Sequence, residues 1–243
     1  MKLHILAIAA HPDDIELGCA GTLIKHARLG QPVGILDLTE SSLSTRGDIQ
    51  TRYAEAEEAG KIIGLAVREN AKMQDGFFRN DEEHQRRLIT YIRRWQPDIV
   101  LANALEDRHP DHGRGGELIR DACFLAGLAK IETVWEGKQQ QAWRPKRVFH
   151  MIQDRLLEPT FIVDISDAQV AKMEAVRAYR SQFHQKETSE PATYISSENF
   201  LKQLEYRDAL CGKRIGVEFG EGFVSESIPG ISTLDHLLYP ILP

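Results

Sequence analysis

Two short clusters of histidine and carboxylate residues stand out along the chain. The first lies in AAHPDDIELG, residues 9–18, and contains His11, Asp13, Asp14 and Glu16. The second lies in EDRHPDHGRGG, residues 106–116, and contains His109, Asp111 and His112. Imidazole and carboxylate groups are ligands of catalytic zinc, which takes three protein ligands and keeps one position for water. Further acids and histidines beside such an ion can serve as general base and general acid.

The two clusters together supply enough groups for a hydrolytic metal site. Two histidines and one aspartate would hold the ion, and one aspartate and one histidine would remain for proton transfer. Each cluster alone also has a structural interpretation, because His-Pro-Asp sequences form turns and Asp13 or Asp14 could simply cap a helix. The presence of both clusters favours the metal site. The sequence contains no GxGxxG, GxxxxGK[ST] or GxSxG motif that would indicate another chemistry.

The first half of the chain predicts a sheet that would bring the clusters together. Apolar runs predict strands at 4–10, 33–38 and 98–103, with a weaker one near 66–72, and helical periodicity predicts helices at 15–29, 48–63, 81–95 and 113–128. Continuous apolar strands alternating with amphipathic helices indicate a parallel, Rossmann-like sheet covered on both faces. With strand order 3-2-1-4-5, both clusters follow neighbouring strands at the topological switch point, where such sheets bind ligands.

The second half is less regular. Strands are predicted at 147–153 and 161–165, and helices at 168–184 and 197–213. No linker rich in proline, glycine or serine divides the chain and no repeat is visible, so we expect one domain over residues 1–243. Its Rossmann-like core would span about 1–130 and a modified part about 131–243. The segment 185–196 and the tail beyond 225 have the weakest pattern.

Composition excludes several classes of function. A hydrophobic content of 42% with 27% charged residues is typical of a soluble globular protein. The absence of any run of 18 apolar residues, and of a signal-peptide pattern, predicts a cytoplasmic location without a membrane partner. The net charge of −6 argues against a nucleic-acid partner. Cys19, Cys123 and Cys211 lie far apart, as expected of packing residues in a reduced protein.

The motif pair AHPDD and HPDH resembles that of the LmbE-like, or PIG-L, deacetylases. These are zinc-dependent hydrolases that remove acetyl groups from N-acetylglucosaminyl conjugates. The resemblance continues through LDLTESSLSTRGD (36–48), MIQDRLLEPTFIVDIS (151–166), KMEAVRAYRSQF (172–183) and GVEFGEGF (216–223). The chain is most similar to the bacillithiol branch, whose substrate is N-acetyl-α-D-glucosaminyl L-malate. The resemblance implies a three-layer α/β/α fold with a mostly parallel sheet.

The resemblance also implies roles in catalysis. The positions that match the zinc ligands of the family are His11, Asp14 and His112. One zinc ion per subunit is implied, although these ligand types also accept iron, cobalt or manganese. Asp13 matches the general base that activates the attacking water. His109 matches the histidine that stabilises the oxyanion or protonates the amine, and Asp111 matches the acid that orients a neighbouring histidine.

Three further residues are implied in binding an amino-sugar conjugate. Arg52 matches a substrate-binding arginine, and Arg46 is a second candidate partner for the malate carboxylates, which an arginine pairs bidentately. Tyr194 lies near the position of a tyrosine that assists the oxyanion in some relatives. The family also implies a homo-oligomer, a trimer or a hexamer.

Two alternatives stay open. The substrate could be another N-acetylglucosaminyl conjugate or a chitooligosaccharide fragment such as diacetylchitobiose. The chain could also be a non-catalytic sugar- or nucleotide-binding protein, which would not need Asp13 beside Asp14. Among other acids, we interpret Glu16 as a helix N-terminal charge, Asp75 as a solvated loop residue, and Asp107 with Arg108 as a surface pair.

Overall fold

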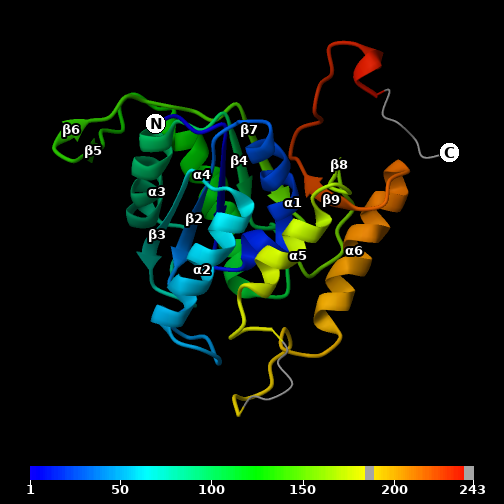
Figure 1. The fold of residues 1–243 in the computed structure, drawn as a ribbon. Coiled ribbons are helices and arrows are strands. Elements are labelled where there is room, and N and C mark those ends of the chain that lie inside the picture. The colour runs from blue at the N-terminus through cyan, green and yellow to red at the C-terminus, as the bar shows by residue number, and fades with distance from the viewer. Residues whose placement is uncertain (184–188, 238–243) are drawn as a thin grey trace.

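A seven-stranded sheet forms the centre of the computed structural model, which describes residues 1–183 and 189–237. Its strand order is β3-β2-β1-β4-β7-β9-β8 (Figure 1). Five strands are parallel: β1 (Ile5–Ala9), β2 (Val33–Thr39), β3 (Val67–Met73), β4 (Ile99–Ala102) and β7 (Arg147–Met151). The strand β9 (Gly220–Val224) is antiparallel to both β7 and β8 (Phe161–Asp164). The predicted order of the first four strands is therefore confirmed.

Helices cover both faces of this sheet, which completes the expected three-layer α/β fold (Figure 1). One face is covered by α1 (Asp14–Arg28), α2 (Ile49–Ile63) and α5 (Gln169–Arg177). The other face is covered by α3 (Glu82–Trp95) and α4 (Pro110–Ala126). The remaining elements are the hairpin β5 (Val134–Trp135) and β6 (Lys138–Gln139), the helix α6 (Phe200–Ile215) beside β9, and a 3₁₀ turn at Leu234–Leu237. Within the described part of the chain, no helix has the length and hydrophobicity needed to cross a bilayer.

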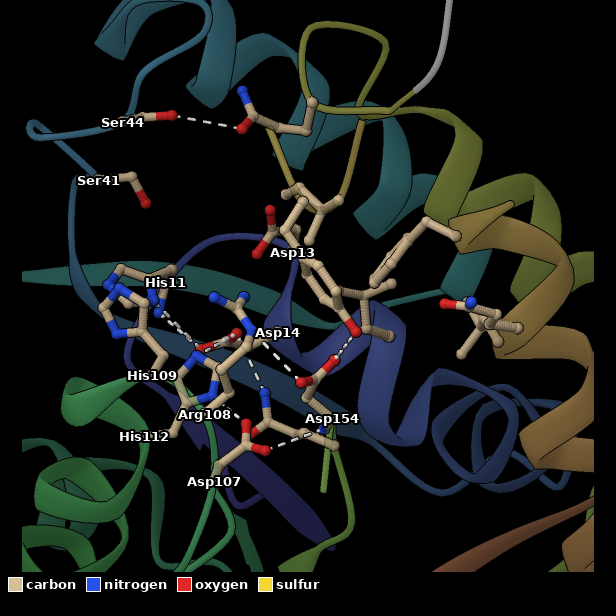
Figure 2. A pocket seen from close by; sticks show the side chains of 18 of the residues that line it. His11, Asp13, Asp14, Ser41, Ser44, Asp107, Arg108, His109, His112 and Asp154 are labelled. Carbon is tan, nitrogen blue, oxygen red and sulfur yellow. Dashed lines mark hydrogen bonds and ion pairs between the residues drawn. The ribbon is translucent and has the colours of Figure 1, made fainter. Parts of the chain in front are cut away.

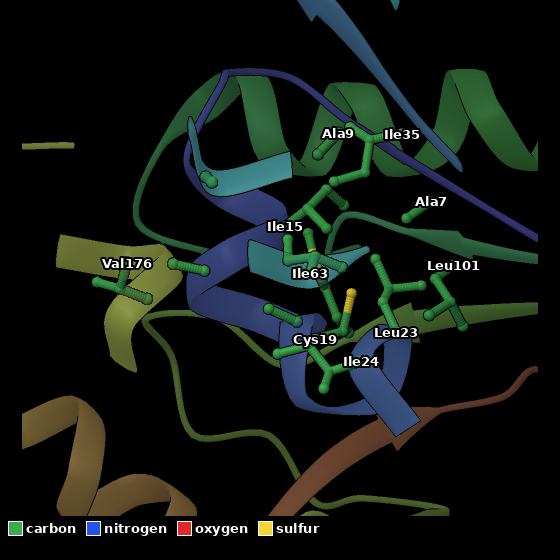
Figure 3. Packing of buried hydrophobic residues seen from close by; sticks show 14 of the residues in the cluster. Ala7, Ala9, Ile15, Cys19, Leu23, Ile24, Ile35, Ile63, Leu101 and Val176 are labelled. Atoms are coloured by element: carbon green, nitrogen blue, oxygen red, sulfur yellow. The ribbon is translucent and has the colours of Figure 1, made fainter. Parts of the chain in front are cut away.

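Two hydrophobic clusters, one on each face, hold the layers together. Figure 3 shows part of the first, in which Ile15, Leu23 and Ile24 of α1 pack over Ile35 of β2 and Leu101 of β4. All five side chains are buried. Burying one such side chain contributes about 1.5–3 kcal/mol, so this contact fixes α1 on the sheet and with it the cluster that begins the helix.

Some boundaries differ from the predicted ones. The helix α4 begins at Pro110 rather than at residue 113, so Asp111 and His112 lie in its first turn and not in a loop. Proline suits this position because it has no N–H to leave unpaired. The helix predicted over 168–184 ends at Arg177, and residue 184 lies outside the described residues. Its last turn tightens to i→i−3 hydrogen bonds, as the Tyr179 N–H donates to the Val176 carbonyl at 3.1 Å, and beyond it the Ser181 N–H donates to Glu55 Oε1 at 2.6 Å.

The helix α1 is kinked at Cys19, where φ is −153° and ψ is 21°. The kink frees backbone N–H groups, and those of Gly21 and Thr22 donate to the Glu221 carboxylate at 2.9 and 2.7 Å. Glu221 is itself buried and lies 2.9 Å from Lys172 Nζ. A buried carboxylate with such partners is well compensated. This pairing ties β9 and α5 to the helix that carries the first cluster.

Glycines bring α4 close to the end of β4. A Cβ atom on Gly116 would lie 2.9 Å from the carbonyl oxygen of Asn103, and one on Gly113 would lie 2.9 Å from that of Leu105. Only glycine fits such a close backbone approach without displacement. The GRGG sequence therefore serves to place the second cluster against the strand end.

Candidate metal centre and active site

The two clusters meet at the carboxyl ends of β1 and β4, as the strand order predicts (Figure 2). The ring centroids of His11 and His109 lie 4.8 Å apart, those of His11 and His112 lie 5.7 Å apart, and those of His109 and His112 lie 5.1 Å apart. All three imidazoles line a cavity of about 500 Å³ together with Asp13 and Asp14. This volume is typical of a small-molecule site.

The Asp14 carboxylate lies between two imidazoles. Its Oδ1 is 3.0 Å from His112 Nε2, and its Oδ2 is 3.5 Å from His11 Nδ1. Ligand atoms that share one tetrahedral zinc ion at about 2.0–2.1 Å lie about 3.3 Å from one another. Both spacings are close to that value and the donor types suit zinc, but they involve different oxygens of Asp14. Among the described residues, the groups whose possible ligand atoms all lie within 4.8 Å of one another are His11 with His109 and His112, and His11 with Asp75 and Asp111.

The second nitrogen of each imidazole faces a carboxylate. His11 Nε2 is 3.1 Å from Asp75 Oδ1 and 3.4 Å from Asp111 Oδ2. His112 Nδ1 is 2.5 Å from Asp107 Oδ2. Metal-bound histidines commonly donate their other N–H to a carboxylate, which fixes the tautomer and the ring orientation. Asp111 thus contacts a neighbouring histidine, as an orienting acid would, but His11 Nε2 lies between Asp111 and Asp75 and is closer to Asp75.

Sequence reasoning missed Asp75 and Asp107 as members of the site. Both side chains are buried against histidines, so the interpretations of Asp75 as a solvated acid and of Asp107 as half of a surface pair are wrong. A signal was present, because Asp75 and Asp107 follow β3 and β4 at the same edge of the sheet. Glu16 lies in the first turn of α1, as predicted, and it is buried and accepts a hydrogen bond from Arg68 at 2.6 Å.

The charges of the three candidate ligands, His11, Asp14 and His112, reinforce one another. Burial alone would lower the pKa of His11, but hydrogen bonds to Asp111, Asp14 and Asp75 hold it well above its ordinary value. Burial opposes the charged form of His112 too, yet Asp14 and Asp107 raise its pKa to about 9. Conversely, although burial would raise the pKa of Asp14, the charge of His112 and the hydrogen bonds from both imidazoles hold it well below its usual range. Since metals bind neutral imidazole, metal binding would displace protons here.

Asp13 lies next to Asp14 in the chain but in a different environment. Its backbone has φ of 112° and ψ of −28°, a conformation that is costly for a residue other than glycine and is typical of functional sites. Arg52 Nη1 donates to Asp13 Oδ2 at 2.8 Å and to the Pro12 carbonyl at 2.9 Å, which holds the strained turn. Burial raises the pKa of Asp13 to about 6, although Arg52 opposes the shift. Such a value suits a group that takes up and returns a proton near neutral pH.

His109 is the N-cap of α4, and its Nδ1 accepts a hydrogen bond from the Asp111 N–H at 3.2 Å. In the neutral ring this contact assigns the proton to Nε2. Burial, followed by the positive charges of His11 and His112, lowers the pKa of His109. Nitrogen atoms of His11, His109 and His112 lie within 4.8 Å of one another, so His109 is also near enough to be a ligand. The hydrogen bond of its Nδ1 to a backbone N–H, instead of to a carboxylate, favours a role as a donor to substrate.

The three predicted substrate-binding residues have different settings. Arg52 lines the cavity, but its guanidinium is engaged by Asp13. Arg46 is buried away from the cavity lining, with Nε 3.2 Å from Glu190 Oε2. Tyr194 lines the cavity and is half exposed, and its hydroxyl donates to Asp154 Oδ1 at 2.9 Å.

Sequence reasoning also missed Arg108 as a residue of the cavity. Its guanidinium lies 4.4 Å from the centre of the Tyr194 ring, and its Nε is 3.3 Å from Asp154 Oδ2 (Figure 2). The side chain is 48% exposed, in contrast to the buried Arg52. A cation at the mouth of the cavity is therefore available to an acidic group of a ligand. The apolar part of the wall comes from Leu17, Leu43, Leu156, Ile195, Phe200, Leu204 and Leu210.

Comparisons with known proteins agree with this geometry. The family model described as PIG-L, GlcNAc-PI de-N-acetylase, matches residues 6–123. The crystal structure of the conserved protein TT1542 from Thermus thermophilus is 34% identical, covers 94% of this chain and 97% of that chain, and has a TM-score of 0.84. The diacetylchitobiose deacetylase of Thermococcus kodakarensis is 28% identical over 239 residues, 93% of this chain and 84% of that protein. The 4-oxalmesaconate hydratase of Pseudomonas putida is 26% identical over 194 residues, 74% of each protein. The chain belongs to the PIG-L, or LmbE-like, family.

Proposed function

We propose that this chain is a metal-dependent amidohydrolase that removes the acetyl group from an N-acetylglucosaminyl conjugate. One observation carries the proposal. Asp14 lies between two imidazoles that are each backed by a buried carboxylate, while Asp13 beside it is held separately by Arg52. The first arrangement suits a metal ion, and the second leaves a base free for proton transfer. Relatives that are deacetylases support amide hydrolysis as the reaction.

The residues divide the steps of the reaction among them. A divalent ion, when bound, would acidify a water molecule and polarise the acetamide carbonyl. Asp13 accepts the proton of the attacking water, and His109 donates its Nε2–H to the carbonyl oxygen as negative charge develops there. Asp13 then returns the proton to the nitrogen as the C–N bond breaks, which gives a free amine and acetic acid, and the acid ionises to acetate with release of the second proton of the water. The resemblance implies that His109 either stabilises the oxyanion or protonates the amine. The geometry supports stabilisation of the oxyanion by a hydrogen bond, because a neutral ring that transferred its only N–H proton would become an anion.

For the substrate, we propose N-acetyl-α-D-glucosaminyl L-malate, the conjugate of bacillithiol biosynthesis. Arg108 supports an acidic aglycone, because it is the half-exposed cation at the cavity mouth and can turn from Asp154 to a carboxylate. Diacetylchitobiose is the competing substrate, supported by the relative from Thermococcus kodakarensis. It has no carboxylate and would leave Arg108 on Asp154.

The test is amine release from the malate conjugate, from diacetylchitobiose and from free N-acetylglucosamine, each with metal-loaded and chelated protein. Release from the malate conjugate alone, lost on chelation and restored by zinc, supports the proposal in full. Preference for diacetylchitobiose would keep the deacetylase and reject the malate assignment. Release from none of them, with hydration of an unsaturated dicarboxylate instead, would reject amide hydrolysis and favour the chemistry of the hydratase relative.

A further inference from the structure

Two buried amide side chains converge on Asp14. Asn103, directly after β4, donates from Nδ2 to Asp14 Oδ2 at 3.2 Å. Gln153, shortly after β7, donates from Nε2 to Asp14 Oδ1 at 3.1 Å. The two side chains are 0% and 4% exposed. Each carboxylate oxygen therefore has an imidazole nitrogen on one side and a side-chain amide donor on another, and Oδ2 also accepts from the His11 backbone N–H at 3.0 Å.

The orientation of both amides is fixed by further contacts. Asn103 Oδ1 accepts from the Ala10 N–H at 2.7 Å, so the nitrogen of this amide must face Asp14. Asn103 Nδ2 also donates to Gln153 Oε1 at 2.7 Å, so the nitrogen of Gln153 must face Asp14 as well. Arg207 Nη1 of α6 donates to the backbone carbonyl oxygen of Gln153 at 2.7 Å, which holds the main chain at this residue. Neither amide can reverse without losing a buried hydrogen bond.

We propose that Asn103 and Gln153 form an amide clamp that orients the Asp14 carboxylate for its metal. This rests on the proposed metal-dependent function. The Gln153 N–H occupies one lone-pair direction of Oδ1 and leaves the other direction of that oxygen for the ion, whereas Oδ2 accepts from both Asn103 Nδ2 and the His11 backbone N–H and is held in place. The donors are uncharged, so they fix the carboxylate without neutralising the charge that attracts the ion. Asp13 differs from Asp14 in this respect, because its hydrogen-bond donor is the positively charged Arg52.

The alternative is that the amides only satisfy buried hydrogen bonds of the fold. The two explanations differ in what the removal of one donor changes. Loss of a partner behind a metal ligand typically weakens metal binding by about 10- to 100-fold. Loss of a hydrogen bond that serves the fold alone lowers stability and leaves the metal affinity of the folded protein unchanged.

The test compares two variants of the full chain. Gln153→Met keeps the length of the side chain and the backbone contact to Arg207, and removes the donor to Asp14. Gln203→Met is the matched control, because Gln203 is an exposed amide of α6 on the wall of the same cavity. Zinc affinity is measured by competition with a chromophoric chelator on metal-free protein, and the melting temperature of the metal-free protein reports its folding.

We expect Gln153→Met to bind zinc about 10- to 100-fold more weakly than the parent chain while its metal-free form still melts cooperatively. Gln203→Met should bind zinc as the parent chain does. Equal zinc affinity in the parent chain and Gln153→Met, or equal losses in both variants, would overturn the clamp. Tight zinc binding by the parent chain without amine release would overturn the deacetylase proposal and leave the clamp in place, so the two failures are distinguishable.

Discussion

The ion pair between Arg52 and Asp13 offers a direct test of which group is the base. The variant Arg52→Met removes the guanidinium and keeps a side chain of similar length. Both partners are buried, and Arg52 Nη1 lies 2.8 Å from Asp13 Oδ2. Burial raises the pKa of Asp13, and with the opposing effect of Arg52 included that pKa is about 6. Removal of Arg52 must therefore raise that pKa.

The size of this shift follows from the interaction that is lost. A hydrogen bond to a charged group contributes about 1.5–3 kcal/mol, and one pKa unit corresponds to about 1.4 kcal/mol. We therefore expect the pKa of Asp13 to rise by about 1–2 units in Arg52→Met. A bound metal ion would lower the pKa of Asp13 in both proteins, so the difference between the two metal-loaded enzymes is the quantity to compare.

The assay is the pH dependence of kcat/KM for deacetylation. A general base acts when ionised, so activity rises with pH through the pKa of Asp13. The rise of kcat/KM with pH should occur at higher pH in Arg52→Met than in the parent chain. Well above the shifted pKa, kcat/KM should come close to that of the parent chain. The control Arg52→Lys keeps a positive charge and should move the limb less. Melting temperatures check that each variant is folded, because Arg52 also holds the Pro12 carbonyl.

One result would refute this reasoning. If the ascending limb stays in place while KM rises, Arg52 binds substrate, as the resemblance alone implies, and another group is the base. A limb that moves to lower pH would likewise exclude Asp13, because removing a neighbouring cation can only stabilise the protonated carboxyl.

Three other variants test the remaining roles in the site. Asp13→Asn should lower kcat by about 10²- to 10⁴-fold and leave zinc affinity unchanged, as measured by turnover and chelator competition; an equal loss of zinc would make Asp13 a ligand. Asp107→Asn removes the charge behind His112 and should weaken zinc binding by about tenfold, which the same competition measures; unchanged binding would leave Asp107 without a role at the metal. Arg108→Gln should raise KM for the malate conjugate by about fivefold, in line with a partly exposed ion pair of about 1 kcal/mol, and leave KM for diacetylchitobiose unchanged; equal effects on both would remove Arg108 from aglycone recognition.

The parallel half of the fold could be predicted because its sequence pattern is local. The strands β1, β2 and β4 are short apolar runs buried on both faces, and the intervening helices carry one apolar face each. Glycines end α1 and α2, with φ of 74° at Gly30 and 83° at Gly64. The strand order then places the two clusters at one edge of the sheet without any knowledge of side-chain contacts.

The remaining features depend on partners distant in the sequence. The carboxylate that accepts from the backbone just beyond α5 belongs to Glu55 of α2, and the carboxylate that pairs with Arg46 belongs to Glu190. The strand β9 contains Gly220 and Gly222 and pairs antiparallel at only two positions with β7. Its composition, with two glycines in five residues, does not predict a strand. Asp107, by contrast, has its partner His112 only five residues along the chain, and its place after β4 was the sequence signal for it.

The roles proposed for Asp13 and Asp14 depend on the fold. Two identical side chains follow each other in the chain, and no local pattern says which is ligand and which is base. The difference comes from partners on other elements. Asp14 meets two imidazoles and two amides, and its pKa lies well below the ordinary value, whereas Asp13 meets Arg52 in a buried setting and its pKa is about 6. Pairs of acids whose environments push their pKa values apart divide acid–base work in this way. The surrounding imidazoles, amides and Arg52, and not the aspartates themselves, therefore decide which carboxylate is suited to bind a metal and which to accept a proton.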